Sequence, residues 1–390
     1  MRGSKIVKNI PEKWELKTFG DVLSIGSGKD YKHLNAGDIP VYGTGGLMTF
    51  VDQYLFDGES VGIGRKGTID KPVLLKGKFW TVDTLFYTHS FKGVIPYFIF
   101  TVFQSIDWRR YNEATGVPSL SKVIIEKIPL LVPPLPEQQK IAEILSTVDE
   151  KIDIIDQQIA ETEELKKGLM QRLLTKGIGH TEFKDSPLGK IPKSWEVKKL
   201  GEVCDVRDGT HDSPKYHKEG VPFITSKNLT DTKLSFDDVK FISEEDHASF
   251  SKRSHVENGD ILFGMIGTVG KPVIVNEDFS FSIKNVALLK FADSRSLNNV
   301  FALNVLKSVI VDEQFKKVSN GGVLNFVALG NIRNLLFPVP PLTEQLKMSK
   351  LFNAADDKVG VLNAKKTSYQ ELKKGLMQKL LTGKVRVNVE

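Results

Sequence analysis

The stretch ELKKGLMQRLLT at residues 164–175 returns almost unchanged as ELKKGLMQKLLT at residues 371–382, with one difference in twelve positions. Upstream of each copy, PPLPEQ at 133–138 recurs as PPLTEQ at 340–345, at the same spacing of 207 residues. Internal repeats define the architecture of a chain more directly than any local pattern. A long repeat that is present only twice predicts a pseudo-symmetric pair of units rather than a solenoid.

Two further pairs of segments extend the repeat towards the start of each copy. PEKWELKTFGDV at 11–22 recurs as PKSWEVKKLGEV at 192–203, and GTIDKPV at 67–73 recurs as GTVGKPV at 267–273. The order of the segments is the same in both copies, but the spacing grows from 181 to 207 residues. The variable region of the second copy is therefore expected to be longer by loop insertions.

Each variable region has the pattern of a mixed α/β domain. Short apolar runs, such as VIIEKIPLLV (123–132) and DILFGMI (260–266), alternate with frequent glycines, as in strands separated by turns. A long helix is expected after each P-P-L, because Pro136 suits a first helical turn and Glu137 is favourable at the positive helix end. The predicted fold class is α+β: two similar mixed α/β domains separated by two long antiparallel coiled-coil helices, with a pseudo-twofold internal repeat.

The repeat also predicts the domain boundaries. We expect a first domain at residues 1–136, a central helix at 137–175 and a linker at 176–194. A second domain follows at 195–343, then a C-terminal helix at 344–382 and a tail at 383–390.

Both predicted helices carry apolar residues at alternating steps of four and three, which is the spacing of a coiled-coil seam. The expected pairing residues are Ile141, Leu145, Val148, Ile152, Ile155 and Ile159 in the first helix and Met348, Phe352, Val359 and Leu362 in the second. Lys366 interrupts the second seam. Residues 137–175 carry a net charge of −4 and residues 344–382 a net charge of +4, which favours pairing of the two helices, although exposed ion pairs stabilise little. The alternative is that each helix packs on its own domain.

Composition narrows the class of protein. The chain has 390 residues, of which 40% are hydrophobic and 26% charged, so it has room for two or three domains. It has no apolar run long enough to span a membrane, no apolar signal-peptide stretch in MRGSKIVKNI, and a single cysteine, Cys204. We therefore expect a cytoplasmic protein that does not bind membranes. The net charge is +6, but residues 14–132 sum to +1 and 195–339 to −1, which favours local basic patches over a strongly basic domain.

The common catalytic motifs are missing. GSGKD at 26–30 lacks the first glycine and the final Ser/Thr of a phosphate-binding loop, and no dinucleotide-binding glycine pattern follows a strand. The Asn/Asp-Pro-Pro-aromatic tetrapeptide of amino-methyltransferases is absent. The seven histidines lack metal-ligand spacing, and His211 and His217 fit a surface or DNA-facing loop better than a metal site. Cys204 follows Val203 in an apolar run and fits a small buried hydrophobic residue. The sequence predicts a chain without catalytic activity and without a metal.

Several segments resemble one family, the specificity (S) subunits of type I restriction–modification enzymes. DGTHDSPKYHKEGVPFITSKNL at 208–229 resembles the start of a target recognition domain in that family, and SGKDYKHLNAGDIPVYGTGG at 27–46 resembles another variant of it. The order of the motifs is also typical of that family. A Gly-Thr turn is followed by Gly-Lys-Pro or a related tripeptide, and then by P-P-L-x-E-Q and a long helix. With the duplication, the resemblance extends over residues 11–382.

The resemblance implies which partners the chain binds and which subunit of the complex carries out each reaction. Two target recognition domains would each read one half of a bipartite, asymmetric site in double-stranded DNA through the major groove. The paired helices would set the spacing and dock two methylation (M) subunits, and motor-nuclease (R) subunits would join through the complex. No cofactor is expected on this chain, whereas S-adenosylmethionine, ATP and Mg are expected on the partner subunits.

Residue type in loop-like stretches indicates the candidate DNA contacts, because Arg, Lys, Asn, Ser and Thr read base edges and Lys, Arg and Tyr contact phosphates. They are Lys29, Tyr31, Lys32, Tyr42, Thr44, Arg65 and Lys66 in the first copy, and Thr210, His211, Lys215, Tyr216, Ser226, Lys227 and Asn228 in the second. Support of the fold remains an alternative role for each of them.

Other classes of function remain open at this point. A stand-alone DNA-binding protein of the same fold would lack methyltransferase partners. A nuclease or methyltransferase would need an active site that the motifs do not reveal. A purely structural coiled-coil adaptor would not need such large variable domains.

Overall fold

The computed structural model describes residues 10–292, 294–318 and 325–389. The first nine residues, which hold most of the N-terminal stretch considered above, lie outside the described residues. The chain forms two compact units: unit 1 comprises the described residues up to Gln157 and those from Asn363 onward, and unit 2 comprises Gln158–Leu362. The boundary falls inside both long helices, so the predicted division into domains and helices stays a prediction. Among the described residues, no helix is both long and apolar enough to cross a membrane.

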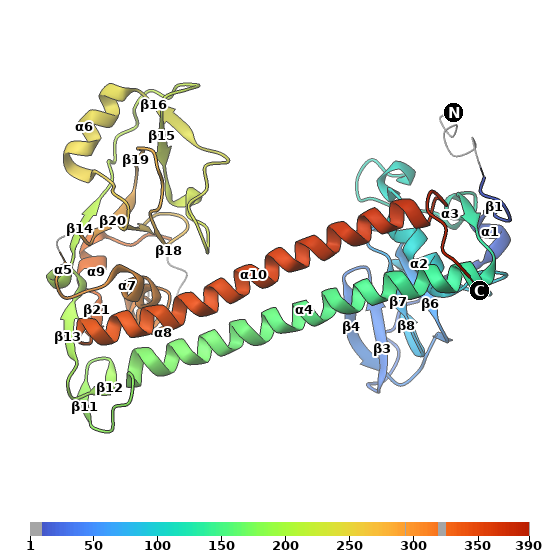
Figure 1. The fold of residues 1–390 in the computed structure, drawn as a ribbon, viewed down its shortest axis with the longest axis horizontal. Coiled ribbons are helices and arrows are strands. Elements are labelled where there is room, and N and C mark those ends of the chain that lie inside the picture. Colours follow the sequence, from blue (N-terminus) through green and yellow to red (C-terminus); the bar gives the residue numbers. More distant parts are fainter. Residues whose placement is uncertain (1–9, 293, 319–324, 390) are drawn as a thin grey trace. The chain divides into compact units, whose positions relative to one another are not determined.

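Unit 1 contains two four-stranded sheets and a two-stranded ribbon (Figure 1). The first sheet has the order β2-β9-β6-β7, the second the order β4-β3-β8-β5, and the ribbon joins β1 to β10. The strands are β1 (Glu15–Thr18), β2 (Ser24–Ser27), β3 (Ile39–Gly43), β4 (Gly46–Val51), β5 (Phe56–Asp57), β6 (Ser60–Gly64), β7 (Val73–Leu75), β8 (Lys78–Thr81), β9 (Leu85–His89) and β10 (Pro129–Val132). The helices of this domain are α1 (Phe19–Val22), α2 (Pro96–Ser105), η1 (Trp108–Tyr111) and α3 (Lys122–Glu126).

Unit 2 repeats this topology with insertions. Its four-stranded sheet, β14-β20-β17-β18, matches the first sheet of unit 1 in order, and β13 pairs with β21 as β1 pairs with β10. A parallel pair, β15 with β19, corresponds to β3 with β8. The strands are β11 (Phe183–Ser186), β12 (Gly189–Pro192), β13 (Glu196–Lys199), β14 (Asp205–Asp208), β15 (Val221–Ile224), β16 (Lys240–Ile242), β17 (Ile261–Gly264), β18 (Gly270–Ile274), β19 (Ser282–Ile283), β20 (Val286–Lys290) and β21 (Leu336–Val339). The helices are α5 (Leu200–Val203), η2 (Ser226–Asn228), α6 (Glu244–Ser254), α7 (Asn299–Leu306), α8 (Val309–Val318) and α9 (Leu329–Arg333).

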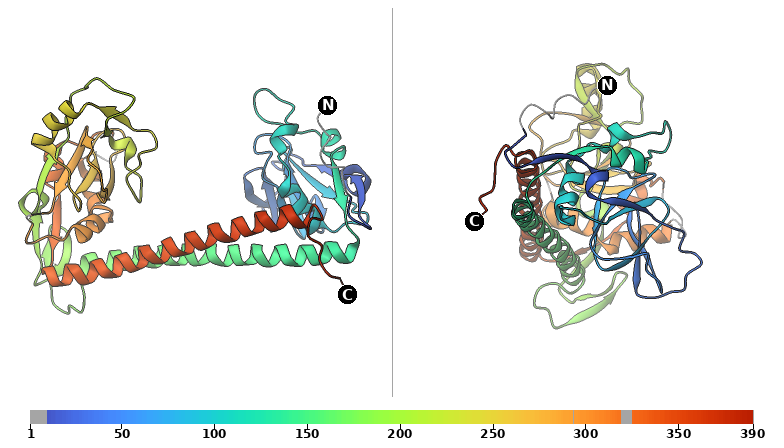
Figure 2. Two further views of the ribbon diagram at one scale, coloured as in Figure 1. Left: turned by 45° about the horizontal axis from the view of Figure 1, so that its top comes forward. Right: turned by 90° about the vertical axis from the view of Figure 1, so that its right-hand side faces the viewer.

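The two long helices are α4 (Leu135–Lys176) and α10 (Leu342–Leu380). Within each unit, their segments lie side by side and run in opposite directions (Figures 1 and 2). Each helix begins directly after the strand that closes a ribbon, β10 or β21, because the Pro-Pro pair cannot continue the strand ladder.

The repeated segments at the start of each copy and at the start of each helix contact one another. The Trp14 indole donates a hydrogen bond of 2.9 Å to the Glu137 carboxylate, and the Trp195 indole donates one of 3.0 Å to the Glu344 carboxylate. We call each such Trp–Glu contact a joint. The repeat thus preserves the two residues that fasten a domain to the beginning of its helix.

The glutamine of P-P-L-x-E-Q has a second shared role. Gln138 accepts a hydrogen bond from the backbone amide of Ile95 (3.1 Å) and donates to the carbonyl of Gly93. Gln345 accepts from the amide of Asn298 (2.9 Å) and donates to the carbonyl of Ser296. Both side chains are completely buried, so each amide satisfies backbone groups that would otherwise lie unpaired in the interior.

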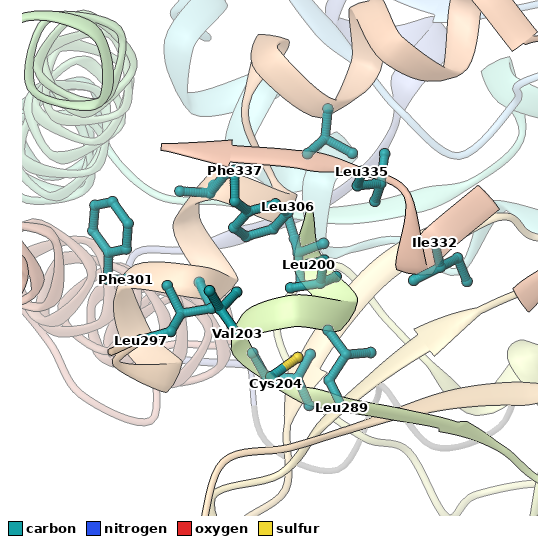
Figure 3. Close-up of a cluster of buried hydrophobic side chains, with 14 of the residues drawn as sticks. Leu200, Val203, Cys204, Leu289, Leu297, Phe301, Leu306, Ile332, Leu335 and Phe337 are labelled. Atoms are coloured by element: carbon teal, nitrogen blue, oxygen red, sulfur yellow. The ribbon is translucent and has the colours of Figure 1, made fainter. Parts of the chain in front are cut away.

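The nearly identical segments ELKKGLMQRLLT (164–175) and ELKKGLMQKLLT (371–382) end in the cores of the units. Leu173 and Leu174 of α4 lie in the main core of unit 2 with Trp195. Figure 3 shows other members of this core, among them Phe301 and Phe337. In unit 1, Met377 and Leu380 of α10 lie in a core with residues such as Phe19, Phe98 and Trp108. A segment that fills an equivalent gap in two similar cores must keep its shape, because interiors are close-packed.

The beginnings of the helices enter these cores as well. Ile141 and Leu145 are buried in unit 1 with Met377 and Leu380, and Met348 and Phe352 are buried in unit 2 with Leu173 and Leu174. At these ends, packing on a domain and packing on the other helix occur together rather than as alternatives. Further along the seam, Val148, Ile155 and Leu362 are buried, while Ile152, Ile159 and Val359 are half-buried.

Ion pairs join the two helices within each unit. Lys373 lies 2.6 Å from Asp149 in unit 1, and Lys166 pairs with Asp356 in unit 2. The two pairs are equivalent under the repeat spacing of 207 residues. Lys366, which interrupts the apolar seam in the sequence, lies 2.6 Å from Asp156. The interruption is therefore matched by an acid on the partner helix.

Candidate nucleic-acid interface

In unit 1, many of the predicted residues lie around one turn, residues 81–84 between β8 and β9. The backbone amide of Lys29 donates to the carbonyl of Thr81 (2.8 Å), and the amide of Val82 donates to the carbonyl of Tyr42 (3.0 Å). The amides of Arg65 and Lys66 both donate to the carbonyl of Thr84, at 2.8 and 3.3 Å. We call residues 81–84 the central turn of unit 1. It gathers side chains from loops that lie far apart in the sequence.

A basic hollow of about 620 Å³ lies beside this central turn. Arg65, Lys66 and Lys122 line it together with one acid, Asp83, and with neutral residues such as Phe86 and Ser119. The Arg65 guanidinium and the Lys122 ammonium lie 5.9 and 5.8 Å from the centroid of the Phe86 ring. Arg65 and Lys66 are exposed, so this group of cations is available to an anionic partner.

The other predicted residues of unit 1 divide into exposed and supporting side chains. Lys29 and Lys32 are exposed, and the carbonyl of Lys29 is held by the Trp80 indole at 2.8 Å. Tyr31 is half-buried against a cluster that includes Trp80, so its ring supports the loop that presents the two lysines. Thr44 is half-buried in the turn after β3.

Unit 2 has an equivalent central turn, residues 283–285 between β19 and β20. The amide of Thr210 donates to the carbonyl of Ile283 (3.1 Å), and the amide of Asn285 donates to the carbonyl of Thr210 (3.2 Å). One ring nitrogen of His211 lies 2.6 Å from the Asn285 amide oxygen. Asn285 has a positive φ of 53°, a conformation that asparagine tolerates better than most residues.

A polar network surrounds His211. Its other ring nitrogen lies 3.0 Å from the buried Asp208 carboxylate, which also pairs with Arg253. The Lys284 ammonium donates to the Ser213 hydroxyl at 2.6 Å. The side chains of His211 and Arg253 are 60% and 63% exposed, so the network holds donors at the surface while its acid is buried.

The three predicted residues of η2 have different positions. Lys227 is exposed, whereas Ser226 and Asn228 are buried. The Asn228 side chain accepts from the amide and the hydroxyl of Thr225 and donates to the carbonyl of Ser235. In this structure, Ser226 and Asn228 support the fold, and only Lys227 of this group presents a side chain to the surface.

Lys215 and Tyr216 lie on a different part of unit 2. Tyr216 is partly exposed, its ring lies 6.3 Å from that of Phe223 on β15, and the Lys240 ammonium of β16 lies 4.2 Å from its centroid. Lys215 is exposed. Tyr216 therefore packs on the three-stranded sheet β16-β15-β19, and Lys215 is its exposed neighbour in the chain.

Sequence reasoning did not select Lys122, Lys284 or Arg253. Lys122 opens a run that is otherwise apolar, and Arg253 lies in the charged helix α6, so local composition gave no reason to choose them. The amide of Lys284 donates to the carbonyl of Ile224 as the amide of Val82 donates to that of Tyr42, so the equivalent residue of the first copy is apolar and gave no reason to choose Lys284.

The structure offers little for metal or thiol chemistry. Among the described residues, no group of three or more His, Cys, Asp or Glu side chains is placed to hold a metal ion. Burial raises the pKa of the Cys204 thiol to about 12, so the thiol stays protonated in the core of unit 2 (Figure 3).

Comparison with known proteins identifies the family. The model of the type I restriction modification DNA specificity domain matches residues 11–164 and 192–372. The specificity subunit of the type I restriction enzyme MjaVIII from Methanocaldococcus jannaschii is 29% identical to this chain over 344 residues. The match spans 85% of this chain and 78% of that protein. The putative MjaX specificity subunit of the same organism is 30% identical over 73% of this chain and 65% of its own length.

Solved structures show the same fold. A type I restriction–modification S subunit from M. genitalium superposes with a TM-score of 0.62 at 14% identity, covering 99% of both chains. A second chain, from a study of complex assembly and conformational transition in the type I R-M system, gives a TM-score of 0.58 at 16% identity and covers 97% of this chain and 100% of that one. Since the family model matches most of the sequence in two regions, this chain belongs to the type I restriction–modification DNA specificity family and carries two of its recognition domains.

Proposed function

We propose that this chain is the DNA-reading subunit of a type I restriction–modification complex and that each unit reads one half of a bipartite, asymmetric site. The observation that carries the proposal is the pair of central turns, which have the same topology in both units but different side chains around them. Two non-identical readers in one chain suit an asymmetric site, whereas two identical subunits would favour a palindrome.

The exposed and half-buried side chains near the central turns have the chemistry that DNA requires. Unit 1 offers Arg65, Lys66 and Lys122 around the basic hollow, with Lys29 and Lys32 on the neighbouring loop. Unit 2 offers Thr210, His211 and Lys227, joined by Lys284 and Arg253. Arginine and lysine read guanine edges and neutralise phosphates, so a mixture of base and backbone contacts is expected. Tyr42, Thr44, Lys215 and Tyr216 remain secondary candidates.

The long helices are proposed to pair as an antiparallel coiled coil and to dock two methylation (M) subunits. Large apolar side chains are exposed at equivalent positions of the repeat: Leu135 with Leu342, Ile154 with Val361, and Leu165 with Leu372, at exposures between 41% and 70%. Two copies of one partner would meet the same side chains on each half of the repeat. Single exposed apolar side chains are common on any surface, so it is their recurrence at equivalent positions of the repeat that supports docking.

The remaining chemistry of the complex is assigned to the partners. Methyl transfer from S-adenosylmethionine would belong to the M subunits, and ATP-driven, Mg-dependent motor and nuclease activity to the R subunits that join through the complex. This chain would supply specificity and binding energy and would not be an enzyme by itself.

The decisive experiment is methylome sequencing of cells that express the M subunits with and without this chain. We expect methylation at one bipartite site only when both are present, and no methylation by the purified chain alone. Exchange of 195–339 for the equivalent region of a relative should change one half-site and leave the other intact. A change in both half-sites, or methylation without M subunits, would refute the proposal. Specific DNA binding without any M partner would instead support a stand-alone binding protein.

The proposed role of the helices as a spacer has its own test. Four helix-forming residues inserted after Ile155, with a matching insertion beside Lys366, would lengthen the paired helices by about 6 Å. That length corresponds to slightly less than two base pairs at about 3.4 Å each. We expect both half-sites to stay the same and the gap between them to grow by one or two base pairs. An unchanged gap at full activity would mean that the helices do not set the spacing.

A further inference from the structure

The turn that follows β6 in unit 1 and β17 in unit 2 has the same backbone in both units. Gly67 donates its amide to the carbonyl of Pro118 (2.8 Å), and Gly267 donates its amide to the carbonyl of Asn325 (2.9 Å). Both glycines have positive φ, at 91° and 74°. A single β-bridge closes each turn, formed by Lys66 with Ser119 in unit 1 and by Ile266 with Phe326 in unit 2.

The side chains on this shared backbone differ completely in character. In unit 1, the bridge pairs a cation with a hydroxyl beside the basic hollow. In unit 2, the same bridge pairs an isoleucine that is 42% exposed with a phenylalanine that is 56% exposed. Two large apolar side chains therefore stand at the surface where the other unit presents a basic and polar pair.

The turn with the apolar pair and the central turn of unit 2 adjoin the same end of the β17–β20 strand pair. In the register of β17 and β20, Gly264 is opposite Val286, so the turn that carries Ile266 leaves β17 at the end where the central turn, with Lys284 and Asn285, enters β20. His211 contacts Asn285, and Ser213 contacts Lys284. An apolar contact flanked by an imidazole, an amide and an ammonium matches the major-groove edge of an A·T pair, which presents the C5-methyl group of thymine next to hydrogen-bonding atoms.

We propose that Ile266 and Phe326 form an apolar contact with the C5-methyl group of a thymine in the half-site read by unit 2. The inference rests on the proposed function and extends it, because it assigns a base and an atom to a pair of residues. The equivalent pair in unit 1, Lys66 with Ser119, then makes a polar contact. The two units thus differ in the kind of readout at one shared position.

The experiment uses the assembled complex of this chain with its M subunits and the target site found by methylome sequencing. Each thymine of the second half-site is replaced in turn by uracil, which lacks only the methyl group. With the unmodified chain, we expect one replacement to weaken binding by about fourfold, the factor for one buried methyl-sized group. With Ile266→Ser and Phe326→Ser together, the complex should bind thymine and uracil sites equally.

Controls keep the outcomes distinct. Lys66→Ser serves as the matched variant in unit 1 and should leave the response of the second half-site to uracil unchanged. Co-purification of the Ile266 and Phe326 variant with the M subunits would show that the chain is folded and assembled. If no uracil replacement matters, or if it matters equally in the variant, the thymine contact is refuted while the proposed function stands. Loss of M-subunit binding in the variant would also refute it and would assign the pair to a protein contact. Absence of any methylated site with the unmodified chain would refute the proposed function itself.

Discussion

The joints of the two units share the hydrogen bond between a tryptophan and a glutamate but differ in the other partners of the glutamate. In unit 1, Glu137 is 1% exposed and binds Trp14 together with two nitrogens of Arg386, at 2.6 and 2.9 Å. In unit 2, the Glu344 side chain is 11% exposed and binds Trp195, the amide of Ile178 (2.9 Å) and a ring nitrogen of His180 (2.9 Å). Arg386 follows α10, and Ile178 and His180 follow α4.

This difference shows how a tandem copy diverges. The tryptophan and the glutamate lie in the repeated segments, so both units retain them. The remaining partners come from the segment that leaves the other long helix, which is a tail in one case and a linker in the other. The hydrogen bonds to Glu137 raise the pKa of the Arg386 guanidinium, so unit 1 has a permanently charged partner, whereas unit 2 relies on an imidazole and a backbone amide.

The largest expected effect is the loss of stability when the glutamate of a joint is removed, and it should differ between the two units. Glu137→Ala removes a buried carboxylate and leaves the Trp14 indole and the Arg386 guanidinium without their partner, so we expect it to lower the free energy of unfolding of unit 1 by about 3 kcal/mol. Glu344→Ala should cost about 2 kcal/mol or less in unit 2, because its partners, an indole, an imidazole and a backbone amide, include no guanidinium. Hydrogen exchange of the β1–β10 and β13–β21 ribbons as a function of denaturant measures each unit separately. An equal or reversed order would contradict this view of the joints.

A second comparison concerns the equivalent ion pairs of the helices. Lys373 has a side chain that is 12% exposed and binds both Asp149 and Gln104, while Tyr97 donates to the same aspartate at 2.7 Å. Burial and this hydrogen bond raise the pKa of Tyr97, so its hydroxyl remains a donor at all ordinary pH values.

We therefore expect Lys373→Met to destabilise unit 1 by about 2 kcal/mol. Its repeat equivalent, Lys166→Met, should cost unit 2 less than about 1 kcal/mol, because Asp356 is 56% exposed and the pair is screened by water. Methionine retains the packing of the long side chain, so the substitution tests the charge alone. Denaturant midpoints of the two variants provide the measurement, and equal losses would show that burial does not distinguish the pairs.

A third prediction compares the contribution to DNA binding of Arg65, at the basic hollow of unit 1, with that of Lys227, in η2 of unit 2. Arg65→Ala should weaken DNA binding by the complex by about 1–2 kcal/mol, and Lys227→Ala should also weaken it. A base contact would relax specificity at one position of one half-site, whereas a phosphate contact would lower affinity on all sequences and reduce the salt dependence by about one charge. Binding titrations at several salt concentrations distinguish the two. Unchanged affinity would remove the tested residue from the interface.

The smallest expected effect is a difference in acid stability. His89 ends β9, and Lys290 takes its place in β20. Burial, helped by the charge of Lys122, lowers the pKa of His89 below 6.5. Burial also lowers the pKa of Lys290, but hydrogen bonds to Glu257 and Asp260 outweigh it and raise the pKa above 10.5.

The two groups act in opposite pH ranges. The contribution of His89 to stability is complete above pH 6.5 and is lost as the pH falls, because the unfolded chain binds the proton more readily. The contribution of Lys290 is complete below pH 10.5 and is lost only above it. Unit 1 should therefore weaken slightly between pH 7 and pH 5.5 while Lys290 has no such effect on unit 2. Hydrogen exchange of β9 and β20, corrected for the intrinsic rate, measures this, and His89→Gln should abolish the response of unit 1.

The sequence by itself determined the larger features of this protein. The repeat predicted two similar units and two long helices after the P-P-L motifs, because identical segments at a constant spacing must have equivalent surroundings. Its resemblance to the specificity subunits identified the family, which the family model confirms over 11–164 and 192–372. It also placed Arg65, Lys66, Thr210 and His211 in loops, where residue type alone made them candidates for DNA contact.

Only the tertiary structure decided how distant residues combine. It brings Arg386 to Glu137 across 249 positions, matches Lys366 with Asp156, and buries Asn228 although its residue type favoured an exposed role. It adds Lys122 to the hollow and sets Ile266 against Phe326 on one bridge. Local patterns record which residues are polar or apolar, but burial and pairing depend on chain segments that meet only after folding. The sequence could therefore predict the units and their helices, while the contents of each reading surface required the fold.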